Sequence, residues 1–249
     1  MNIPFNFYNQ HGYIVLKNIF SFEEILAMKN SVERLHNVSK TLKEDSEIFN
    51  SKFIINPDSK ICQRVIWAGG IEPILLKYGQ DLRITQLVSQ LLNTNILMHI
   101  INQVHFKNPN DNVGFKAHQD IWNRDKQDGT YIDIDKKGSF IQTMIAIDEH
   151  NHNNGGLYII PNSHKLNRVN YNDKNELIDS MGNKVDISKK IYLNLEPGDL
   201  ALWSPYLIHG SDPNQSDKPR NALINGYCLE GANSRIYSGC GIGQKIIIK

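Results

Sequence analysis

The stretch FKAHQDIWNRD, residues 115–125, places a histidine and a carboxylate two positions apart among apolar and aromatic neighbours. Side chains alternate across a β-strand, so residues two apart share a face. On a strand, His118 and Asp120 would point the same way, together with Lys116 and Trp122. An imidazole nitrogen and a carboxylate oxygen on one face are suitable metal ligands. The alternative is an ordinary polar patch on a strand edge or loop, and this pair alone leaves both interpretations open.

A third ligand is expected from a different strand, and His209 ends the strongly apolar run LWSPYLIH. Two histidines and one carboxylate occupy one face of an octahedron and leave the other positions open. That arrangement is typical of non-haem Fe(II) oxygenases, whereas a structural zinc site closes its shell with four protein ligands. His150 and His152 lie near Asp148, but their segment is rich in Asn and Gly and predicts a flexible turn. These two are therefore weaker metal candidates.

Arg220 is the residue that favours the metal interpretation. It follows His209 by eleven residues, past a turn, at the start of another predicted strand. A guanidinium makes bidentate, charge-assisted hydrogen bonds to a carboxylate. A dicarboxylate co-substrate could chelate the metal at one end and reach Arg220 at the other. Ser211, which shares a face with His209, could add a hydroxyl bond to the same carboxylate. The alternative for Arg220 is a solvated turn residue.

The first part of the chain predicts elements that support the site. Residues 12–20 read as a strand, and Ser21 with Glu24 forms a capping box at the start of a helix. The apolar residues of that helix recur at helical spacing: Ile25, Met28, Val32 and Leu35. Residues 81–92 predict a second helix. Its expected buried side comprises Leu82, Leu87, Val88 and Leu91. Residues 40–70 are ambiguous.

After residue 95 the sequence changes to short strands separated by Pro, Gly, Asn and Asp turns. The expected strands lie within residues 95–107, 139–148, 155–163, 190–195, 199–211 and 220–229. Helices followed by many short strands predict a mainly β fold, a sandwich or jelly roll with helices packed outside it. We expect one domain over residues 1–249, with a helical part at about 1–93 and a jelly-roll core at about 94–230.

The polar residues 168–190 look like a long excursion from the sheet with few apolar anchors, which predicts a lid loop. The residues that line the substrate pocket are expected in three segments. These are residues 123–138, residues 168–190 and the tail at residues 230–241.

Composition limits the classes of partner. The formal net charge of +1 gives no support for nucleic acid or a membrane surface as a partner. The three cysteines, Cys62, Cys228 and Cys240, are few and far apart, so no disulfide framework is legible. No basic-then-apolar signal pattern and no membrane-length apolar run is present. A small-molecule partner and a cytoplasmic location are expected.

The sequence resembles the phytanoyl-CoA dioxygenase family of Fe(II)/2-oxoglutarate oxygenases, which includes ectoine hydroxylase. The resemblance covers nearly the whole chain. It is carried by GYIVLKNIFSFEEI, HQD, NNGGLYIIPNSHK, EPGDLALWSPYLIHGS and the Arg220 that follows. It implies a double-stranded β-helix, the cupin-like jelly roll flanked by helices. It also implies that Fe(II), 2-oxoglutarate and O₂ take part in the reaction.

Carried over by position, the resemblance makes His118, Asp120 and His209 the iron ligands. It makes Arg220 and Ser211 the partners of the distal carboxylate of 2-oxoglutarate. Further contacts to the co-substrate are implied for Lys107, His105 and, less directly, Thr143. Gln103 alternates onto the face of His105, and Trp122 resembles an active-site aromatic residue past the metal ligands. For His105 and Trp122, plain core packing is the alternative.

The resemblance implies hydroxylation of a substrate C–H bond with release of succinate and CO₂. Asn162 replaces a glycine that is common in the family, which is a turn variation. Asp120 is present where related halogenating enzymes have a small residue, so halogenation is disfavoured. A non-redox jelly roll, either a metal-dependent isomerase or lyase or a small-molecule binder, remains the alternative. Arg220 and Ser211 argue against it, because such a protein needs no dicarboxylate clamp.

Overall fold

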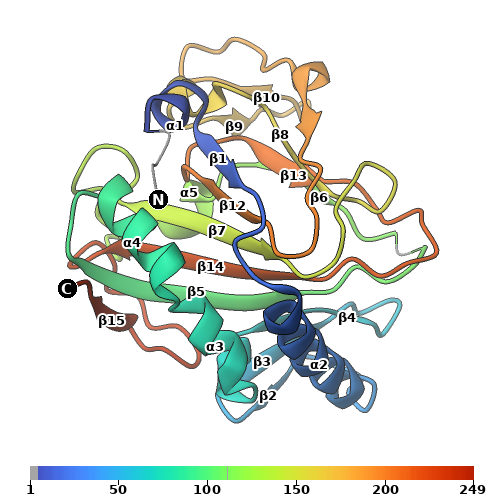
Figure 1. Cartoon of the computed structure of the whole chain (residues 1–249). Helices are drawn as coiled ribbons and strands as arrows, with labels where there is room; N and C mark the ends of the chain where they lie inside the picture. Colours follow the sequence, from blue (N-terminus) through green and yellow to red (C-terminus); the bar gives the residue numbers. More distant parts are fainter. Residues whose placement is uncertain (1–4, 111) are drawn as a thin grey trace.

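A large antiparallel sheet forms one layer of the molecule. The computed structural model describes residues 5–110 and 112–249 (Figure 1). Within them the major sheet has nine strands in the order β1-β12-β7-β14-β5-β4-β3-β2, with β15 paired to β5. Its strands are β1 (Tyr13–Leu16), β2 (Ser46–Ile48), β3 (Ser51–Ile55), β4 (Cys62–Ile66), β5 (Ile96–His105), β7 (Phe140–Ala146), β12 (Leu200–Trp203), β14 (Ala222–Leu229) and β15 (Gln244–Ile247).

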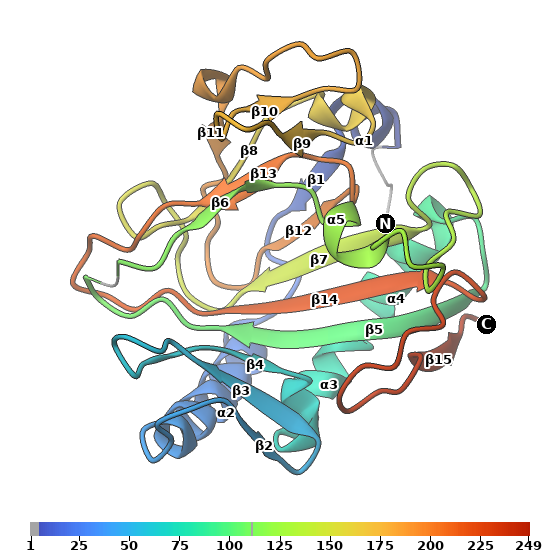
Figure 2. The ribbon, with the colours of Figure 1, turned by 180° about the vertical axis from the view of Figure 1, so that it is seen from behind.

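A smaller antiparallel sheet lies over one face of the major sheet, as Figure 2 shows. Its order is β11-β8-β13-β6, made of β11 (Ile191–Tyr192), β8 (Leu157–Ile159), β13 (His209–Ser211) and β6 (Phe115–His118). Two facing antiparallel sheets with helices outside confirm the predicted jelly roll. The space between the sheets is where side chains from both can meet.

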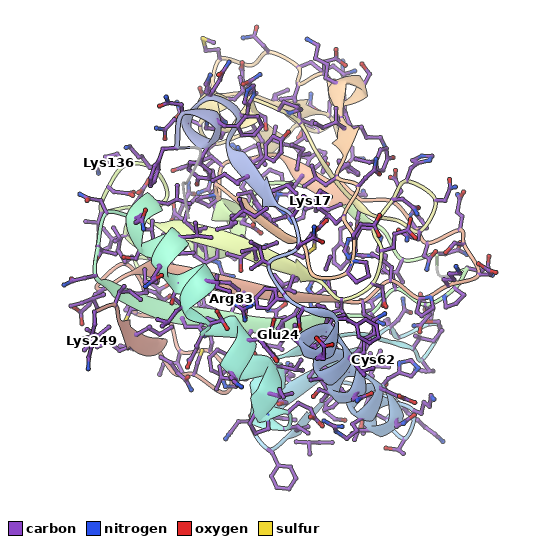
Figure 3. The ribbon with its side chains drawn as sticks, in the orientation of Figure 1. Lys17, Glu24, Cys62, Arg83, Lys136 and Lys249 are labelled. Atoms are coloured by element: carbon purple, nitrogen blue, oxygen red, sulfur yellow. The ribbon has the colours of Figure 1, made fainter. Side chains whose placement is uncertain are left out.

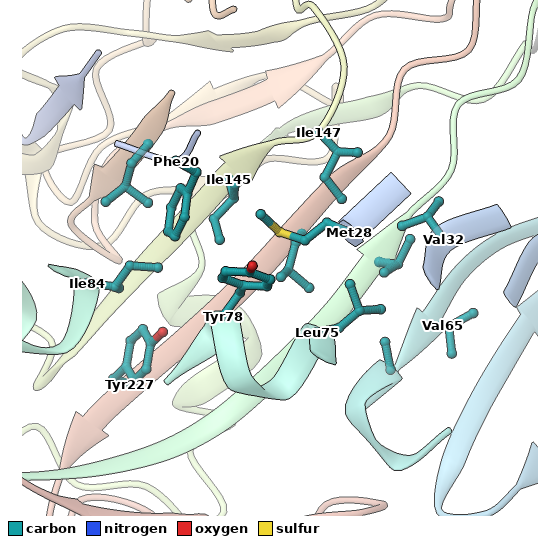
Figure 4. Packing of buried hydrophobic residues seen from close by; sticks show 14 of the residues in the cluster. Phe20, Met28, Val32, Val65, Leu75, Tyr78, Ile84, Ile145, Ile147 and Tyr227 are labelled. Atoms are coloured by element: carbon teal, nitrogen blue, oxygen red, sulfur yellow. The ribbon is translucent and has the colours of Figure 1, made fainter. Parts of the chain in front are cut away.

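Helices cover the outer face of the major sheet (Figure 1). They are α2 (Phe22–Ser39), α3 (Pro73–Gly79) and α4 (Leu82–Leu91). The other helical elements are α1 (Phe5–His11), α5 (Ile121–Arg124) and the short 3₁₀ turns η1 (Ala68–Gly70), η2 (Ser163–Leu166) and η3 (Ile187–Lys189). Figure 4 shows the buried apolar layer under these helices, with Met28 and Val32 of α2 packed near Leu75 and Ile145.

The predicted capping box is confirmed. The Glu24 amide donates to the Ser21 hydroxyl at 3.3 Å, and the Ser21 amide donates to the Glu24 carboxylate at 2.8 Å. The same carboxylate pairs with Arg83 of α4 at 2.6 Å, and both residues are labelled in Figure 3. This ion pair joins α2 to α4 on the outer face of the sheet.

Two expectations for the N-terminal part are wrong. Residues 40–70 contain β2, β3 and β4, which extend the major sheet, so residues 1–93 are not simply helical. In α4 the buried residues include Ile84, Leu87 and Val88, while Leu82 is 61% exposed. Leu82 precedes Ile84 by two residues and therefore lies about 200° around the helix axis from it.

The predicted strand at residues 199–211 is two strands in different sheets. β12 ends at Trp203, the corner Ser204–Tyr206 follows, and β13 begins at His209. The Leu207 amide donates to the Ser204 carbonyl at 2.9 Å and closes the corner. The corner carries the chain from the major sheet to the minor sheet, and this brings Trp203 and His209 together.

Residues 168–190 do not lack apolar anchors. They contain β9 (Asn170–Tyr171), β10 (Leu177–Ile178) and η3. Val169, Leu177 and Val185 are buried in a cluster with Tyr158 and Ala117. Ala117 alternates with His118 along β6, so this cluster lies on the outer face of the minor sheet. Residues 168–190 therefore pack against the minor sheet. The expectation of a lid rested on a lack of apolar anchors in the segment, and that premise is wrong.

Candidate metal centre and its cavity

His118, Asp120 and His209 come together between the two sheets. His118 ends β6 and His209 begins β13, and the two are direct cross-strand partners. Asp120 follows two residues after His118, at the start of α5. One ligand atom from each residue lies within 4.8 Å of the others. Asp120 is 3.6 Å from Nε2 of His209 and 4.0 Å from Nε2 of His118. A single ion can therefore contact all three side chains.

Backbone carbonyls fix the orientation of both imidazoles. Nδ1 of His118 is 2.8 Å from the Lys116 carbonyl, and Nδ1 of His209 is 2.9 Å from the Leu207 carbonyl. A carbonyl only accepts hydrogen bonds, so each Nδ1 carries the proton and each Nε2 offers a lone pair. Burial lowers the pKa of His209 to about 4, which keeps this imidazole neutral. The donor set of two imidazole nitrogens and one carboxylate fits Fe(II).

Trp203 holds the Asp120 carboxylate, and this residue was not predicted from the sequence. Its indole Nε1 donates to Asp120 Oδ2 at 2.8 Å. Gln119, between the two ligands, points away from the site and is fully buried. Its amide nitrogen donates to the carbonyls of Asn167 and Tyr206 at 2.7 Å each. The turn that carries His118 and Asp120 is thus fixed on both sides by residues far away in the sequence.

Replacing Trp203 by phenylalanine should weaken Fe(II) binding by about tenfold while the triad remains. Partners that orient a metal ligand contribute about 10–100-fold to metal affinity, and phenylalanine keeps the apolar contact but removes the N–H donor. Fe(II) titration of the variant under anaerobic conditions measures the effect. Trp122→Phe is the matched control, because the indole of Trp122 donates instead to the Val169 carbonyl at 2.8 Å. Equal affinities of wild type and Trp203→Phe would contradict the positioning role.

A cavity of about 580 Å³ opens beside the triad. Charged side chains at its wall are mostly cationic. Arg64, Lys116, Arg124 and Arg220 line it, and Asp120 is the single carboxylate among the described residues that do so. The cavity therefore favours anionic ligands.

Arg220 is a buried cation at this wall. It is 4% exposed, its Nε has no hydrogen-bond partner among the described residues, and burial lowers its pKa to about 10. The acidic residue that acts on it, Asp148, already pairs with Lys29 at 3.0 Å and accepts from the Asn221 amide. Ser211 lines the same cavity. A buried guanidinium facing a cavity is a ready site for a carboxylate.

Three further predicted residues lie at the cavity: Gln103, His105 and Trp122. His105 Nε2 is 3.2 Å from the Gln103 side-chain oxygen, and its ring stacks on Phe115 with centroids 5.4 Å apart. Burial, followed by the charges of Arg64 and Arg220, holds the pKa of His105 well below its usual range. His105 is therefore a neutral polar group beside the cations.

The structure does not bring Thr143 and Lys107 to the cavity wall. Thr143 is fully buried on the helix side of β7, because alternation along the strand turns Gln142 and Met144 toward the cavity. The Lys107 ammonium donates to the carbonyls of Gly155 and Asp212. Lys107 therefore joins two loops beyond the end of β5. Because neither Thr143 nor Lys107 lines the cavity, the expected contacts of these two residues with the co-substrate are wrong in this structure.

Two of the three expected pocket segments contribute to the wall. Asn123 and Arg124 come from residues 123–138, and Tyr237 and Ser238 from the tail, whereas no described residue of 168–190 lines the cavity. Residues of β4 and just after it were missed: Arg64, Ile66 and Trp67. Their segment had no legible pattern, and only pairing of β4 with β5 places it there.

His150 and His152 lie away from the candidate metal centre. Neither lines the cavity, and neither joins a cluster of potential ligands among the described residues. His150 is fully buried, and burial holds its pKa well below the usual range. The positions of His150 and His152 agree with the expectation that they are weaker metal candidates than the triad.

Residues 8–222 match the sequence model of the phytanoyl-CoA dioxygenase (PhyH) family. The chain belongs to this family. Ectoine dioxygenase from Bordetella bronchiseptica is 24% identical over 158 residues, which cover 64% of this chain and 47% of that protein. The chain thus aligns with about half the length of this relative.

Solved structures share the fold. EctD from S. alaskensis, crystallised with 2-oxoglutarate and 5-hydroxyectoine, has a TM-score of 0.72 at 18% identity, covering 98% of this chain and 85% of EctD. The epimerase SnoN, crystallised with Fe³⁺, alpha-ketoglutarate and nogalamycin RO, has a TM-score of 0.67 at 14% identity, covering 90% and 81% of the two chains. Both likenesses support the jelly-roll fold. Among the described residues, no helix has the length and apolarity to cross a membrane.

Proposed function

We propose that this protein is an Fe(II)- and 2-oxoglutarate-dependent dioxygenase that hydroxylates a C–H bond of a small molecule, with release of succinate and CO₂. The observation that carries the proposal is one cavity that holds both a facial triad and a buried guanidinium. His118, Asp120 and His209 would hold the iron, and Arg220 lacks a carboxylate partner within the described residues. Family membership and the 2-oxoglutarate in EctD point the same way.

Each residue has a definable task in this function. The triad leaves the remaining positions of an octahedral ion for exogenous ligands. Arg220, with Ser211 beside it, would bind the distal carboxylate of 2-oxoglutarate and so fix the direction in which the co-substrate extends. Fe(II) with 2-oxoglutarate and O₂ supplies the oxidising chemistry when bound. Trp203 holds the Asp120 carboxylate.

Succinate formation tests the proposal directly. We expect the Fe(II)-loaded protein to convert 2-oxoglutarate slowly to succinate and CO₂ with consumption of O₂ when ascorbate is added, because this reductant supplies the two electrons that the C–H bond of the substrate would otherwise give. The measurement is succinate by mass spectrometry, with and without O₂, in wild type and in Asp120→Ala. No succinate from the wild type, together with no binding of 2-oxoglutarate, would favour the non-redox jelly roll. The non-redox jelly roll is the weaker alternative, because it gives the buried Arg220 guanidinium no ligand to bind.

The epimerase SnoN is a reason to measure the oxidative outcome separately. Hydroxylation adds one oxygen atom to the product, whereas epimerisation leaves its mass unchanged. Product mass therefore distinguishes these two outcomes once a substrate is found.

A further inference from the structure

More positive charge faces the cavity than the metal and co-substrate require. In the proposed function, Asp120 serves the metal and Arg220 serves 2-oxoglutarate. Arg64, Arg124 and Lys116 then remain at the wall without an ion pair to a carboxylate of the described residues. Lys116 is exposed to solvent, whereas the Nε atoms of Arg64 and Arg124 are buried without a hydrogen-bond partner among those residues. Leaving a guanidinium partly desolvated is costly unless a ligand or a neighbouring group compensates its charge. These two arginines are therefore the places to look for a substrate contact.

Arg124 is the more enclosed of the two. It is 8% exposed, and its Nε is buried without a partner among the residues described. Its Nη1 donates to the Tyr237 hydroxyl at 3.0 Å. The guanidinium carbon lies 5.5 Å from the centre of the Phe140 ring and 5.2 Å from that of Tyr237. Two aromatic faces thus hold the guanidinium in place and partly balance its charge.

Arg124 and Arg220 lie toward opposite ends of the cavity. Arg124 stands over Phe140, where β7 begins, and Arg220 precedes Ala222, which pairs with Ala146 at the other end of β7. Asp120 lies between these ends, because its partner Trp203 pairs with Gln142. Figure 2 shows α5, which carries Arg124, toward the C-terminal end of β14.

The wall near Arg124 combines apolar side chains with the neutral polar groups of Asn123 and Ser238, which adjoin Arg124 and Tyr237 in the sequence. Ile100, Ile101 and Trp67 line it, with Tyr237 on the tail. A ligand at this end of the cavity would meet hydrocarbon surface along its body and a fixed guanidinium at one point. Such a surface suits an aliphatic chain that carries one anionic group.

We propose that the substrate is a small organic acid with an aliphatic body, and that Arg124 binds its carboxylate at the end of the cavity opposite Arg220. This inference rests on the proposed function for the identity of the two other ligands. Arg124 is then the residue that selects acids over neutral analogues. The metal lies between the two carboxylate sites, so a carbon of the substrate's body faces it.

Matched acids and amides test this assignment. The probes are the straight-chain acids from butanoate to decanoate and their primary amides, titrated by calorimetry into the Fe(II)-loaded protein without O₂. Each titration is run with and without saturating 2-oxoglutarate. The affinities of an acid and its amide can then be compared even if the protein does not bind 2-oxoglutarate. We expect at least one acid to bind about tenfold more tightly than its amide, from a charge-assisted contact.

Variants locate the contact. Arg124→Gln should abolish the preference for the acid, whereas Arg64→Gln should retain it. Tyr237→Phe keeps the contact between the ring and Arg124 and should retain most of the preference for the acid. This variant therefore shows whether the preference comes from Arg124 itself or from the hydrogen bond between Arg124 and the Tyr237 hydroxyl. Melting temperatures confirm that each variant is folded.

Three results would overturn the proposal. One is equal binding of every acid and its amide by the wild type. Another is an acid preference that survives in folded Arg124→Gln, and the third is a preference lost only in Arg64→Gln.

Discussion

Replacing Arg220 by alanine should weaken 2-oxoglutarate binding by a factor of roughly 30 or more, without loss of iron binding. The far carboxylate of the co-substrate would lose a bidentate partner in a water-poor cavity, at a cost of roughly 2–5 kcal/mol, and about 1.4 kcal/mol corresponds to tenfold in affinity. Arg220 is 4% exposed, so solvent cannot take its place easily. The measurement is anaerobic titration of 2-oxoglutarate into the Fe(II)-loaded protein, followed by the metal-to-ligand charge-transfer band.

Arg220→Lys is the informative companion variant. Lysine keeps the positive charge, but its ammonium group cannot make the two parallel hydrogen bonds that a planar guanidinium makes to a carboxylate. We therefore expect this variant to recover little affinity for 2-oxoglutarate. Arg124→Gln is the matched control, because Arg124 lines the same cavity at the end opposite Arg220. If Arg220→Ala binds 2-oxoglutarate as tightly as wild type, the proposed oxygenase loses its main support.

Alanine at His118, Asp120 or His209 should each reduce Fe(II) affinity by roughly 100-fold or more. Loss of a residue that merely orients a ligand costs about 10–100-fold, so loss of a ligand itself should cost more. All three are needed, because one atom from each lies within 4.8 Å of the others and only together do they present one face to an ion. Competition with an Fe(II) chelator measures the affinity, and circular dichroism checks the fold.

His152→Ala is the control for the triad. This histidine lies outside the cavity wall and packs edge-on against Tyr192, with ring centroids 4.5 Å apart. Its replacement should leave iron affinity within the error of measurement. Normal binding in His209→Ala, or an equal loss in His152→Ala, would show that the ion is held elsewhere.

The sequence could indicate the candidate triad because each ligand has a local signal. His118 and Asp120 are close in sequence, and His209 ends a strongly apolar run, which indicates an inward-facing position. Arg220 has a weaker local signal, and its interpretation needed the triad. Asn162 illustrates a tolerant position: its φ of 66° is left-handed, and Asn adopts that conformation more readily than most residues.

Residues that depend on pairing between distant strands could not be predicted. Arg64 reaches the cavity because β4 pairs with β5, with Arg64 opposite His105. Thr143 was misplaced because alternation fixes which residues share a face but not which face is inward. Leu82 was misplaced for a similar reason, since an apolar residue at a helix end need not lie on the buried stripe.

By itself, then, the sequence determined a mainly β fold with helices outside it, the capping box at Ser21 and the His118–Asp120 pair, because these depend on periodicity and short spacing. The apolar run before His209 indicated the third metal-ligand candidate, and the family resemblance implied the specific jelly roll. The tertiary structure decided which charges share one cavity. It also decided that Trp203 holds Asp120, that Lys107 ties down loops, and that residues 168–190 pack on the minor sheet. These outcomes depend on strand register and on where the chain crosses between sheets, and both are set by the packing of segments far apart in the sequence.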